Sequence, residues 1–308
     1  MKKRTRIAAF TAALLATGSL VLPASAGSIS YPNFSSTAGL TLVGQASTPT
    51  TSDGTVLRVS PGVSGYTSGA AYSDTPITLG SNDIFSTTFQ FRFTSPGGID
   101  PADGITFVLA QNPTGLGGAG VGMGYSGVPN SVAIEFDTYN NAGFGLGDND
   151  GNSSNHVSID TGGQLSNLDL TNVYGNGSCG FPTGSPAQNN NDVFGCMSNG
   201  DVWTVNLGYD GTDLNVFVQD GSGAVDHVID NYAIDIASAL GTNDAFVGFT
   251  SGTGSGWENH DILNWAFADT TQLTNPTTGV PEPFTLALFG VGLAGAAAMR
   301  RRKKAQKV

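Results

Sequence analysis

Positive charge is almost absent from the central part of this sequence. Of the 12 Lys and Arg residues, ten lie before residue 27 or after residue 279, so only Arg58 and Arg92 remain between these limits. The same part carries 23 of the 24 acidic residues, which gives it a formal net charge of −21. Nucleic acid is excluded as a partner, because there is no cationic surface to displace counterions from phosphate. The acidic excess keeps the chain soluble and also fits Ca²⁺-assisted folding or a saline habitat.

Cysteine is scarce as well. Cys179 and Cys196 are the only two, and both lie in an insertion rich in Gly, Asn and Pro. Two lone cysteines in such a loop do not indicate a metal or catalytic site. In an oxidising compartment we expect them to form a disulfide. This bond would close a local loop and contribute ~3 kcal/mol in the chain-entropy model.

Helical periodicity and internal repeats are also lacking. From residue 27 onward, short β-type runs alternate with turns of Gly, Ser, Asn, Asp and Pro, and the chain contains 44 glycines. This pattern predicts an all-β sandwich in which residues 232–240 make at most one or two helical turns. The predicted strands are 39–44, 55–59, 86–93, 104–110, 131–138, 155–160, 202–208, 213–219, 223–229, 245–250 and 261–267.

Long apolar runs occur only near the two ends of the chain. At the start, a basic segment (1–6), an apolar run (7–22) and the small residues 24–26 predict a signal peptide that is removed after residue 26. A membrane-spanning helix is disfavoured there, because the apolar run is short and the small residues follow it directly. Residues 27–268 are therefore expected to form one folded domain.

The second apolar run, residues 284–299, follows a linker (269–279) and the segment Pro281-Glu282-Pro283 and precedes the basic residues 300–304. Taken alone, this order predicts one membrane anchor with its basic end in the cytoplasm. Residues 280–308 resemble the PEP-CTERM sorting signal of Gram-negative bacteria. The resemblance implies transient insertion in the inner membrane, release by a sorting protease near Pro281-Glu282-Pro283, and a final place at the cell surface or in the extracellular matrix.

The stretch from 131 to 160 carries the clearest chemical pattern. Its alternation places Glu135 and Asp137 on one face of a strand and the apolar side chains on the other. An Asn- and Asp-rich loop follows, and His156 begins the next short strand. Carboxylate and amide oxygens suit Ca²⁺, and one imidazole added to carboxylates suits a transition metal such as Mn²⁺.

At these residues the chain resembles the legume-type (L-type) lectins. Their metal strand reads Glu-x-Asp-Thr-aromatic-x-Asn, followed by an Asp and then a His. The matching residues here are Glu135, Asp137, Thr138, Tyr139, Asn141 and His156. Segments 27–46, 85–93, 102–110 and 247–267 also resemble parts of that family in the same order. The resemblance implies a concanavalin A-like jelly-roll β-sandwich, and it leaves a homodimer open.

The resemblance also implies a set of metal ligands. Asp137 would bridge Ca²⁺ and Mn²⁺, with Glu135 and His156 on the Mn²⁺ side. Asn141 and the backbone carbonyl of Tyr139 would lie on the Ca²⁺ side. A second bridging Asp is required from the loop. Asp150 is favoured because it lies six residues before His156, and Asp148 is the alternative.

A sugar site follows from the same resemblance. Asp103 would accept hydrogen bonds from two sugar hydroxyls, after a peptide bond that is cis in the family. Asn141 would donate its amide, and Gly118, or else Gly120, would donate a backbone N–H group. Tyr139 would stack on the apolar face of a pyranose. The last loop, 252–257, would choose between sugars through Ser255 and Trp257.

Each of these residues also has a structural interpretation. Asp103 followed by Gly is an ordinary hairpin turn, and Tyr139 or Trp257 could pack inside the protein. The resemblance gives His260 and Asp261 structural roles in the final strand.

An enzyme is disfavoured. Jelly-roll glycosidases carry a second Glu after the positions of Glu135 and Asp137, but Asn140 and Asn141 hold those places here, and an amide cannot serve as a general acid. The sequence therefore predicts an exported, metal-dependent carbohydrate-binding protein associated with surface polysaccharide. The alternatives are a structural surface protein with the same fold but no sugar binding and, less favoured, a glycoside hydrolase.

Overall fold

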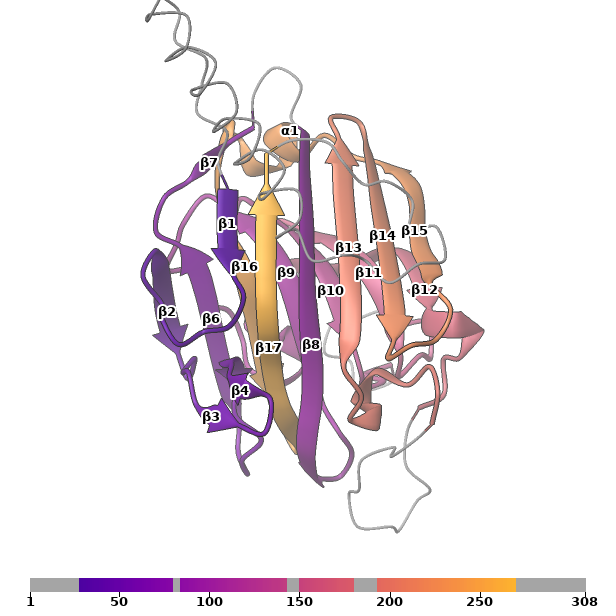
Figure 1. Ribbon diagram of the computed structural model, residues 1–308. Coiled ribbons are helices and arrows are strands. Elements are labelled where there is room, and N and C mark those ends of the chain that lie inside the picture. Colours follow the sequence, from indigo (N-terminus) through magenta and orange to yellow (C-terminus); the bar gives the residue numbers. More distant parts are fainter. Residues whose placement is uncertain (1–27, 80–83, 143–149, 180–192, 270–308) are drawn as a thin grey trace, which may run out of the picture.

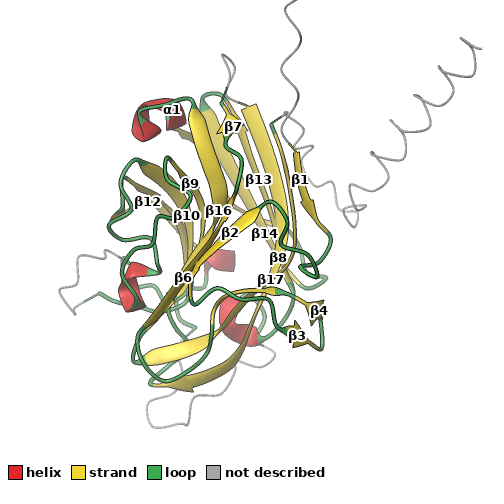
Figure 2. Cartoon of the chain, turned by 90° about the vertical axis from the view of Figure 1, so that its left-hand side faces the viewer, coloured by secondary structure: helices red, strands yellow, loops and turns green. Residues whose placement is uncertain are grey.

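The computed structural model of the chain describes residues 28–79, 84–142, 150–179 and 193–269. They form a sandwich of two antiparallel sheets, which Figure 2 shows as separate layers. The predicted signal peptide, nearly all of the linker, the sorting segment and Asp148 lie outside the described residues.

One sheet has seven strands (Figure 1). Their spatial order is β1 (Ser28–Tyr31), β17 (Gly256–Ala268), β8 (Ile84–Gly98), β13 (Trp203–Asp210), β14 (Asp213–Asp220) and β15 (Asp226–Ala233), with β5 (Leu57–Ser60) also paired to β17.

The other sheet has eight strands. Their order is β12 (Gln164–Asn172), β11 (His156–Thr161), β10 (Ser131–Asp137), β9 (Gly104–Ala110), β16 (Asp244–Thr253), β6 (Thr67–Ser73) and β2 (Leu40–Gly44), with β7 (Ile77–Thr78) also paired to β16. The smaller elements are the hairpin β3 (Thr50–Thr51) and β4 (Gly54–Thr55), the 3₁₀ turns η1 (Gly120–Gly122), η2 (Val173–Gly175) and η3 (Met197–Asn199), and the helix α1 (Ile236–Leu240).

Aromatic side chains join the two sheets. Phe89 of β8 lies with its ring centroid 4.9 Å from Phe249 and 5.8 Å from Phe136, which both belong to the opposite sheet. Both contacts are edge-to-face, the arrangement that the ring quadrupole favours. Ile134 and Phe136 of β10 point into this core, so the predicted alternation along that strand is confirmed.

The outer face of the eight-stranded sheet is covered too. A second cluster of buried residues includes Val108 and Ala133 of the sheet together with Met123, Tyr125 and Val128 of the segment between β9 and β10. Side chains on this outer face of β10 are therefore buried although they point away from the main core. The cover explains how acidic side chains on β10 come to lie out of water.

The predicted all-β sandwich is confirmed, and each predicted strand overlaps an observed one. The predicted one or two helical turns correspond to α1. Five observed strands overlap none of the predicted ranges: β1, β3, β6, β7 and β12.

Candidate functional site

Two adjacent strands bring three metal-ligating side chains together. In the antiparallel ladder, Asp137 of β10 lies directly opposite His156 of β11, and Glu135 lies two residues earlier on the same face. Ligand atoms of Glu135, Asp137 and His156 all lie within 4.8 Å of one another, and all three residues are fully buried. Two carboxylates and one imidazole form a donor set that suits a divalent transition metal.

Hydrogen bonds from β11 and β12 orient this cluster. The Ser158 hydroxyl lies 2.9 Å from Glu135 Oε2 and 2.9 Å from Asn167 Oδ1. His156 Nε2 lies 3.0 Å from the same Asn167 oxygen. Partners of this kind fix the orientation of metal ligands. Asn167 was missed by sequence reasoning, because nothing in the segment 164–172 marks it as a neighbour of His156.

The loop that follows β10 adds oxygen atoms beside the cluster. The Tyr139 N–H group donates to Asp137 Oδ1 at 2.6 Å, and the Asn141 N–H group donates to the Asp150 carboxylate. Asn141 Oδ1 is buried and has no hydrogen-bond partner among the described residues. A buried acceptor without a hydrogen bond lowers the stability of the folded state by about 1–3 kcal/mol. Carboxylate oxygens of Asp137 and Asp150, with this amide oxygen, therefore fit a hard cation such as Ca²⁺.

Asp103 lies at the end of the neighbouring strand. Gly104 of β9 pairs with Asp137 of β10. The Thr138 N–H group donates to the Asp103 carbonyl at 2.9 Å, and the Asp103 N–H group donates to Gly252 at 3.2 Å. The Ala102–Asp103 peptide bond is cis. The start of β9, the residue after β10 and the beginning of the last loop (252–257) therefore meet at Asp103.

Buried polar side chains form hydrogen bonds behind Asp103. The Thr138 hydroxyl lies 3.2 Å from the Asp103 carbonyl oxygen and 3.2 Å from Glu258 Oε1. Glu258 Oε1 in turn lies 3.6 Å from His260 Nε2, and His260 Nδ1 lies 2.9 Å from the Ser251 hydroxyl. Glu258 and His260 are both fully buried, which agrees with a structural role for His260.

The glycine-rich loop comes near Asp103 at Gly254. A methyl group on Gly254 would lie 3.3 Å from Gly120 Cα and 3.6 Å from Asp103 Oδ2, so Gly120 and the Asp103 carboxylate both border this residue. The Gly118 N–H group donates to the Ser126 carbonyl at 3.0 Å. The role of either glycine as a sugar donor stays a prediction.

An exposed aromatic side chain stands at this rim. Tyr66 is 72% exposed, and methyl groups on Gly120 or Gly254 would each lie 3.3 Å from its ring. Its hydroxyl is 3.4 Å from the Ser255 hydroxyl. Tyr66 was missed by sequence reasoning, since it lies far along the chain from every motif that marks the site.

The two aromatic residues named from the sequence lie in different surroundings. Tyr139 is half-buried, and burial raises the pKa of its hydroxyl, with further contributions from the charges of Asp100 and Asp103. Trp257 is half-buried against the backbone of β8, where a methyl group on Gly97 would overlap its indole nitrogen.

Comparisons with known proteins agree with this geometry. The family model for the legume lectin domain matches residues 26–281. The bark lectin of Styphnolobium japonicum is 28% identical over 265 residues, which cover 80% of this chain and 87% of that protein. The solved lectin of Bauhinia forficata, in complex with GalNAc, is 25% identical with a TM-score of 0.60 over 80% of this chain and 99% of that one. Winged bean acidic lectin, solved with methyl-α-D-galactose, is 26% identical with a TM-score of 0.61 over 80% and 100%. The chain belongs to the legume lectin family.

The lectin domain is followed by an export signal. The PEP-CTERM protein-sorting motif matches residues 279–303, which confirms the resemblance predicted for this end and indicates export and membrane sorting in a Gram-negative bacterium. Within the described part of the chain, no helix has the length and hydropathy of a membrane span. The predicted disulfide between Cys179 and Cys196 is present.

The legume lectin relatives are carbohydrate-binding proteins rather than enzymes, which is consistent with the expectation of no catalytic activity. Two carboxylates on one strand are the start of a glycosidase pattern, yet in this lectin domain both lie in the group of buried metal-type ligands around His156.

Proposed function

We propose that this lectin is an exported, metal-dependent carbohydrate-binding protein that associates with polysaccharide at the cell surface. The observation that carries the proposal is that the candidate metal ligands and the candidate sugar acceptor lie next to each other. Glu135, Asp137 and His156 converge within 4.8 Å, and Asp103 is hydrogen-bonded to the residue that follows this metal strand. The candidate metal ligands and the candidate sugar acceptor are thus linked through the backbone at the end of β10.

Two ions fit the residues present. A transition metal such as Mn²⁺ would be held by Glu135, Asp137 and His156. Ca²⁺ would be held by Asp137, Asp150, the Asn141 amide oxygen and the Tyr139 carbonyl. Bound cations would neutralise the buried carboxylates, whose negative charges repel one another at short range.

The sugar would lie on the solvent side of this junction. Asp103 would accept hydrogen bonds from two hydroxyls, while the Asn141 amide and the Gly120 N–H group would donate. Tyr139 and Tyr66 offer ring faces for the apolar side of a pyranose. Ser255 and Trp257 belong to the loop beside Tyr66, where different sugars would be distinguished.

The sorting motif supports the polysaccharide as ligand. A domain carried to the membrane by a PEP-CTERM segment is delivered to the compartment where exported polysaccharide is found, and a sorting protease acting near Pro281-Glu282-Pro283 would release it. The acidic domain itself would be repelled by anionic polymers, so we expect a neutral glycan as the preferred ligand.

A glycan array probed with the full chain tests this function. We expect binding to a set of neutral glycans that disappears with chelator and returns with Ca²⁺ and Mn²⁺. Asp103→Asn should abolish binding, because the amide cannot accept from two hydroxyls as the carboxylate does. Asp230→Asn removes the same charge from a side chain that is 67% exposed, and it should bind as the wild type does.

Absence of glycan binding in the metal-loaded wild type would contradict the proposal and would favour a structural surface role. Release of reducing sugar from the polysaccharide, lost in Glu135→Gln, would instead identify a hydrolase.

A further inference from the structure

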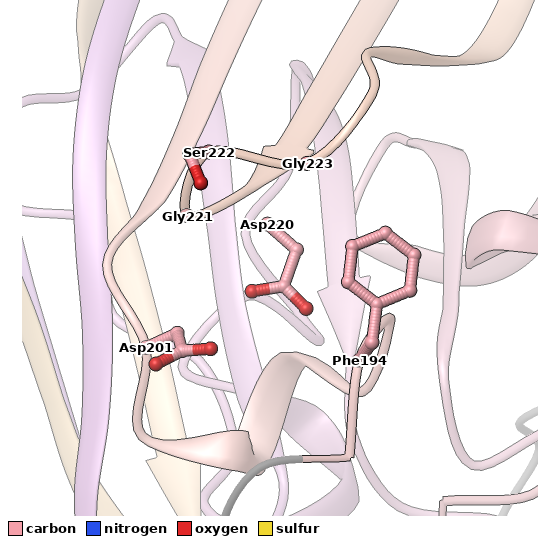
Figure 3. Close-up of a pocket in the computed structure, with 6 residues that line it drawn as sticks. All are labelled: Phe194, Asp201, Asp220, Gly221, Ser222 and Gly223. Carbon is pink, nitrogen blue, oxygen red and sulfur yellow. The ribbon is translucent and has the colours of Figure 1, made fainter.

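A second group of acidic side chains lies outside the candidate sugar site. It borders a hollow of about 330 Å³ beside the end of β14 (Figure 3). The lining residues are Phe194, Asp201, Asp220, Gly221, Ser222 and Gly223. Figure 3 shows Asp201 and Asp220 turned toward each other across this hollow. None of these residues belongs to the cluster on β10 and β11.

The Asp220 carboxylate is buried and only half satisfied. Its residue is 2% exposed. Oδ2 accepts hydrogen bonds from the Gly195 N–H group at 2.7 Å and from Asn199 Nδ2 at 2.9 Å. Oδ1 is buried and has no hydrogen-bond partner among the residues that the structure describes. One oxygen of a fixed carboxylate is therefore left for a ligand from the hollow.

Asn199 holds the two carboxylates side by side. Its Nδ2 group lies 2.9 Å from Asp220 Oδ2 and 3.3 Å from Asp201 Oδ2, so a single amide contacts both acids. Its Oδ1 accepts from the Asp201 N–H group at 2.9 Å and from the Trp203 indole at 3.1 Å. The geometry of the acidic pair is thus set by the protein before any ligand arrives.

The charge of this pair is not balanced by the protein. The two arginines of the lectin domain are engaged elsewhere: Arg58 pairs with Asp261 at 2.8 Å and Arg92 with Asp53 at 2.9 Å. Neither Asp201 nor Asp220 has an ion-pair partner in the described ranges.

We infer that Asp201 and Asp220 bind a divalent cation of the Ca²⁺ class at this hollow, separate from the ions of the sugar site. Such cations take six to eight oxygen ligands from carboxylates, carbonyls and water. Asp220 Oδ1 and the exposed Asp201 carboxylate supply the charged ligands. The Ser222 hydroxyl, nearby carbonyl groups and water supply the rest.

The cation joins the end of β14 to the segment that carries Cys196. Gly195 donates to Asp220, and its carbonyl accepts from Asn155 Nδ2 at 2.7 Å. Asn155 immediately precedes His156 of the sugar-site cluster. Occupation of the hollow therefore stiffens the segment on which β11 begins.

Luminescence of Tb³⁺, a Ca²⁺ analogue, tests the site in the full chain. Excitation of tryptophan sensitises Tb³⁺ ions bound near any of the three tryptophans. The background variant Asp137→Asn removes the first cluster, so the remaining signal reports the ion near Trp203. We expect a bright signal that Ca²⁺ displaces. Loss of a partner of a ligand typically weakens metal binding 10–100-fold. Asp201→Asn, which removes a ligand itself, should therefore weaken Tb³⁺ binding at least about tenfold, whereas Asp230→Asn should leave it unchanged.

Circular dichroism shows whether each variant is folded, and Asp201 is suited to substitution because its side chain is exposed. If Asp137→Asn does not fold, calorimetric counting of Ca²⁺ in the wild type and in Asp201→Asn gives the same comparison, with one ion fewer expected in the variant. Equal Tb³⁺ or Ca²⁺ binding in Asp201→Asn and Asp230→Asn would overturn the inference. The inference would also be overturned if a saccharide bound in the hollow without any cation and this binding disappeared in Phe194→Ala.

Discussion

At the scale of single residues, Asp137 is the side chain that both proposed ions would share. It lies opposite His156 and accepts the Tyr139 N–H group, so it connects the strand with the loop. We predict that Asp137→Asn weakens binding of both Ca²⁺ and Mn²⁺ by at least about 10–100-fold. Losing a hydrogen-bond partner of a ligand already weakens metal binding by this factor, and losing the ligand itself should weaken it more. Calorimetric titration of chelator-treated protein measures both affinities. Wild-type affinity for either ion in this variant would remove Asp137 from that ion's ligand set.

Tyr66 offers a second test at the residue scale, because its exposure separates binding from folding. If its ring stacks on the sugar, Tyr66→Ala should lower the affinity for a glycan by ~0.5–1.5 kcal/mol, or about two- to tenfold. Tyr66→Phe keeps the ring and loses only the contact with Ser255, so it should bind nearly as well as the wild type. Glycan titration of the three proteins distinguishes them. Equal affinity in the alanine variant would place the sugar away from Tyr66.

At the scale of elements, the strands with regular alternation were predictable, whereas strands such as β6 and β12 were not. The alternation of β10 alone predicts which of its residues enter the core. Strand β6, in contrast, consists of small residues apart from Tyr72 and has no hydrophobic alternation. Its Gly69 packs closely against the backbone of β5, because a methyl group there would lie 1.9 Å from the Val59 carbonyl oxygen. Strand β12 has positive φ angles at Asn167 and Asp169, and register shifts interrupt its pairing with β11. These irregular positions are occupied by Asn and Asp, residue types that are common in loops, so the sequence of β12 does not look like that of a strand.

The candidate sugar site depends on the position of the start of β9, which places Asp103. Gly104 has a φ angle of +140°, and a methyl group there would lie 2.2 Å from the Phe136 carbonyl oxygen. We predict that Gly104→Ala separates β9 from β10 at this end, moves Asp103 away from Thr138 and abolishes glycan binding. Gly118→Ala is the matched control, because its nearest neighbour would be 3.9 Å away. Glycan titration and thermal unfolding of both variants check this, and normal binding by Gly104→Ala would show that the junction is not needed.

At the scale of the whole molecule, the candidate site is assembled from segments that are distant in sequence. The cluster of Glu135, Asp137 and His156 could be predicted, because the alternation of β10 and the return of the chain at His156 place these side chains together. The contacts of Asp103 with Gly252, and of Thr138 with Glu258, join residues more than 100 positions apart. Such contacts follow from sheet order, which local patterns do not contain.

The net charge of the molecule leads to the last prediction. With a formal net charge of −21 on residues 27–279, and with several carboxylates buried, the folded state without cations is destabilised by repulsion. Ions that bind only the folded state stabilise it by mass action, by ~2.7 kcal/mol for one site at a hundredfold excess over the dissociation constant. For a domain of this size, that stabilisation corresponds to an increase in Tm of about 5–10 °C. Calorimetric unfolding should show this increase with Ca²⁺ and Mn²⁺ but not with NaCl at equal ionic strength, because salt screens exposed charges and acts much less on buried ones. An equal increase with NaCl would mean that general screening, and not ion coordination, stabilises the fold.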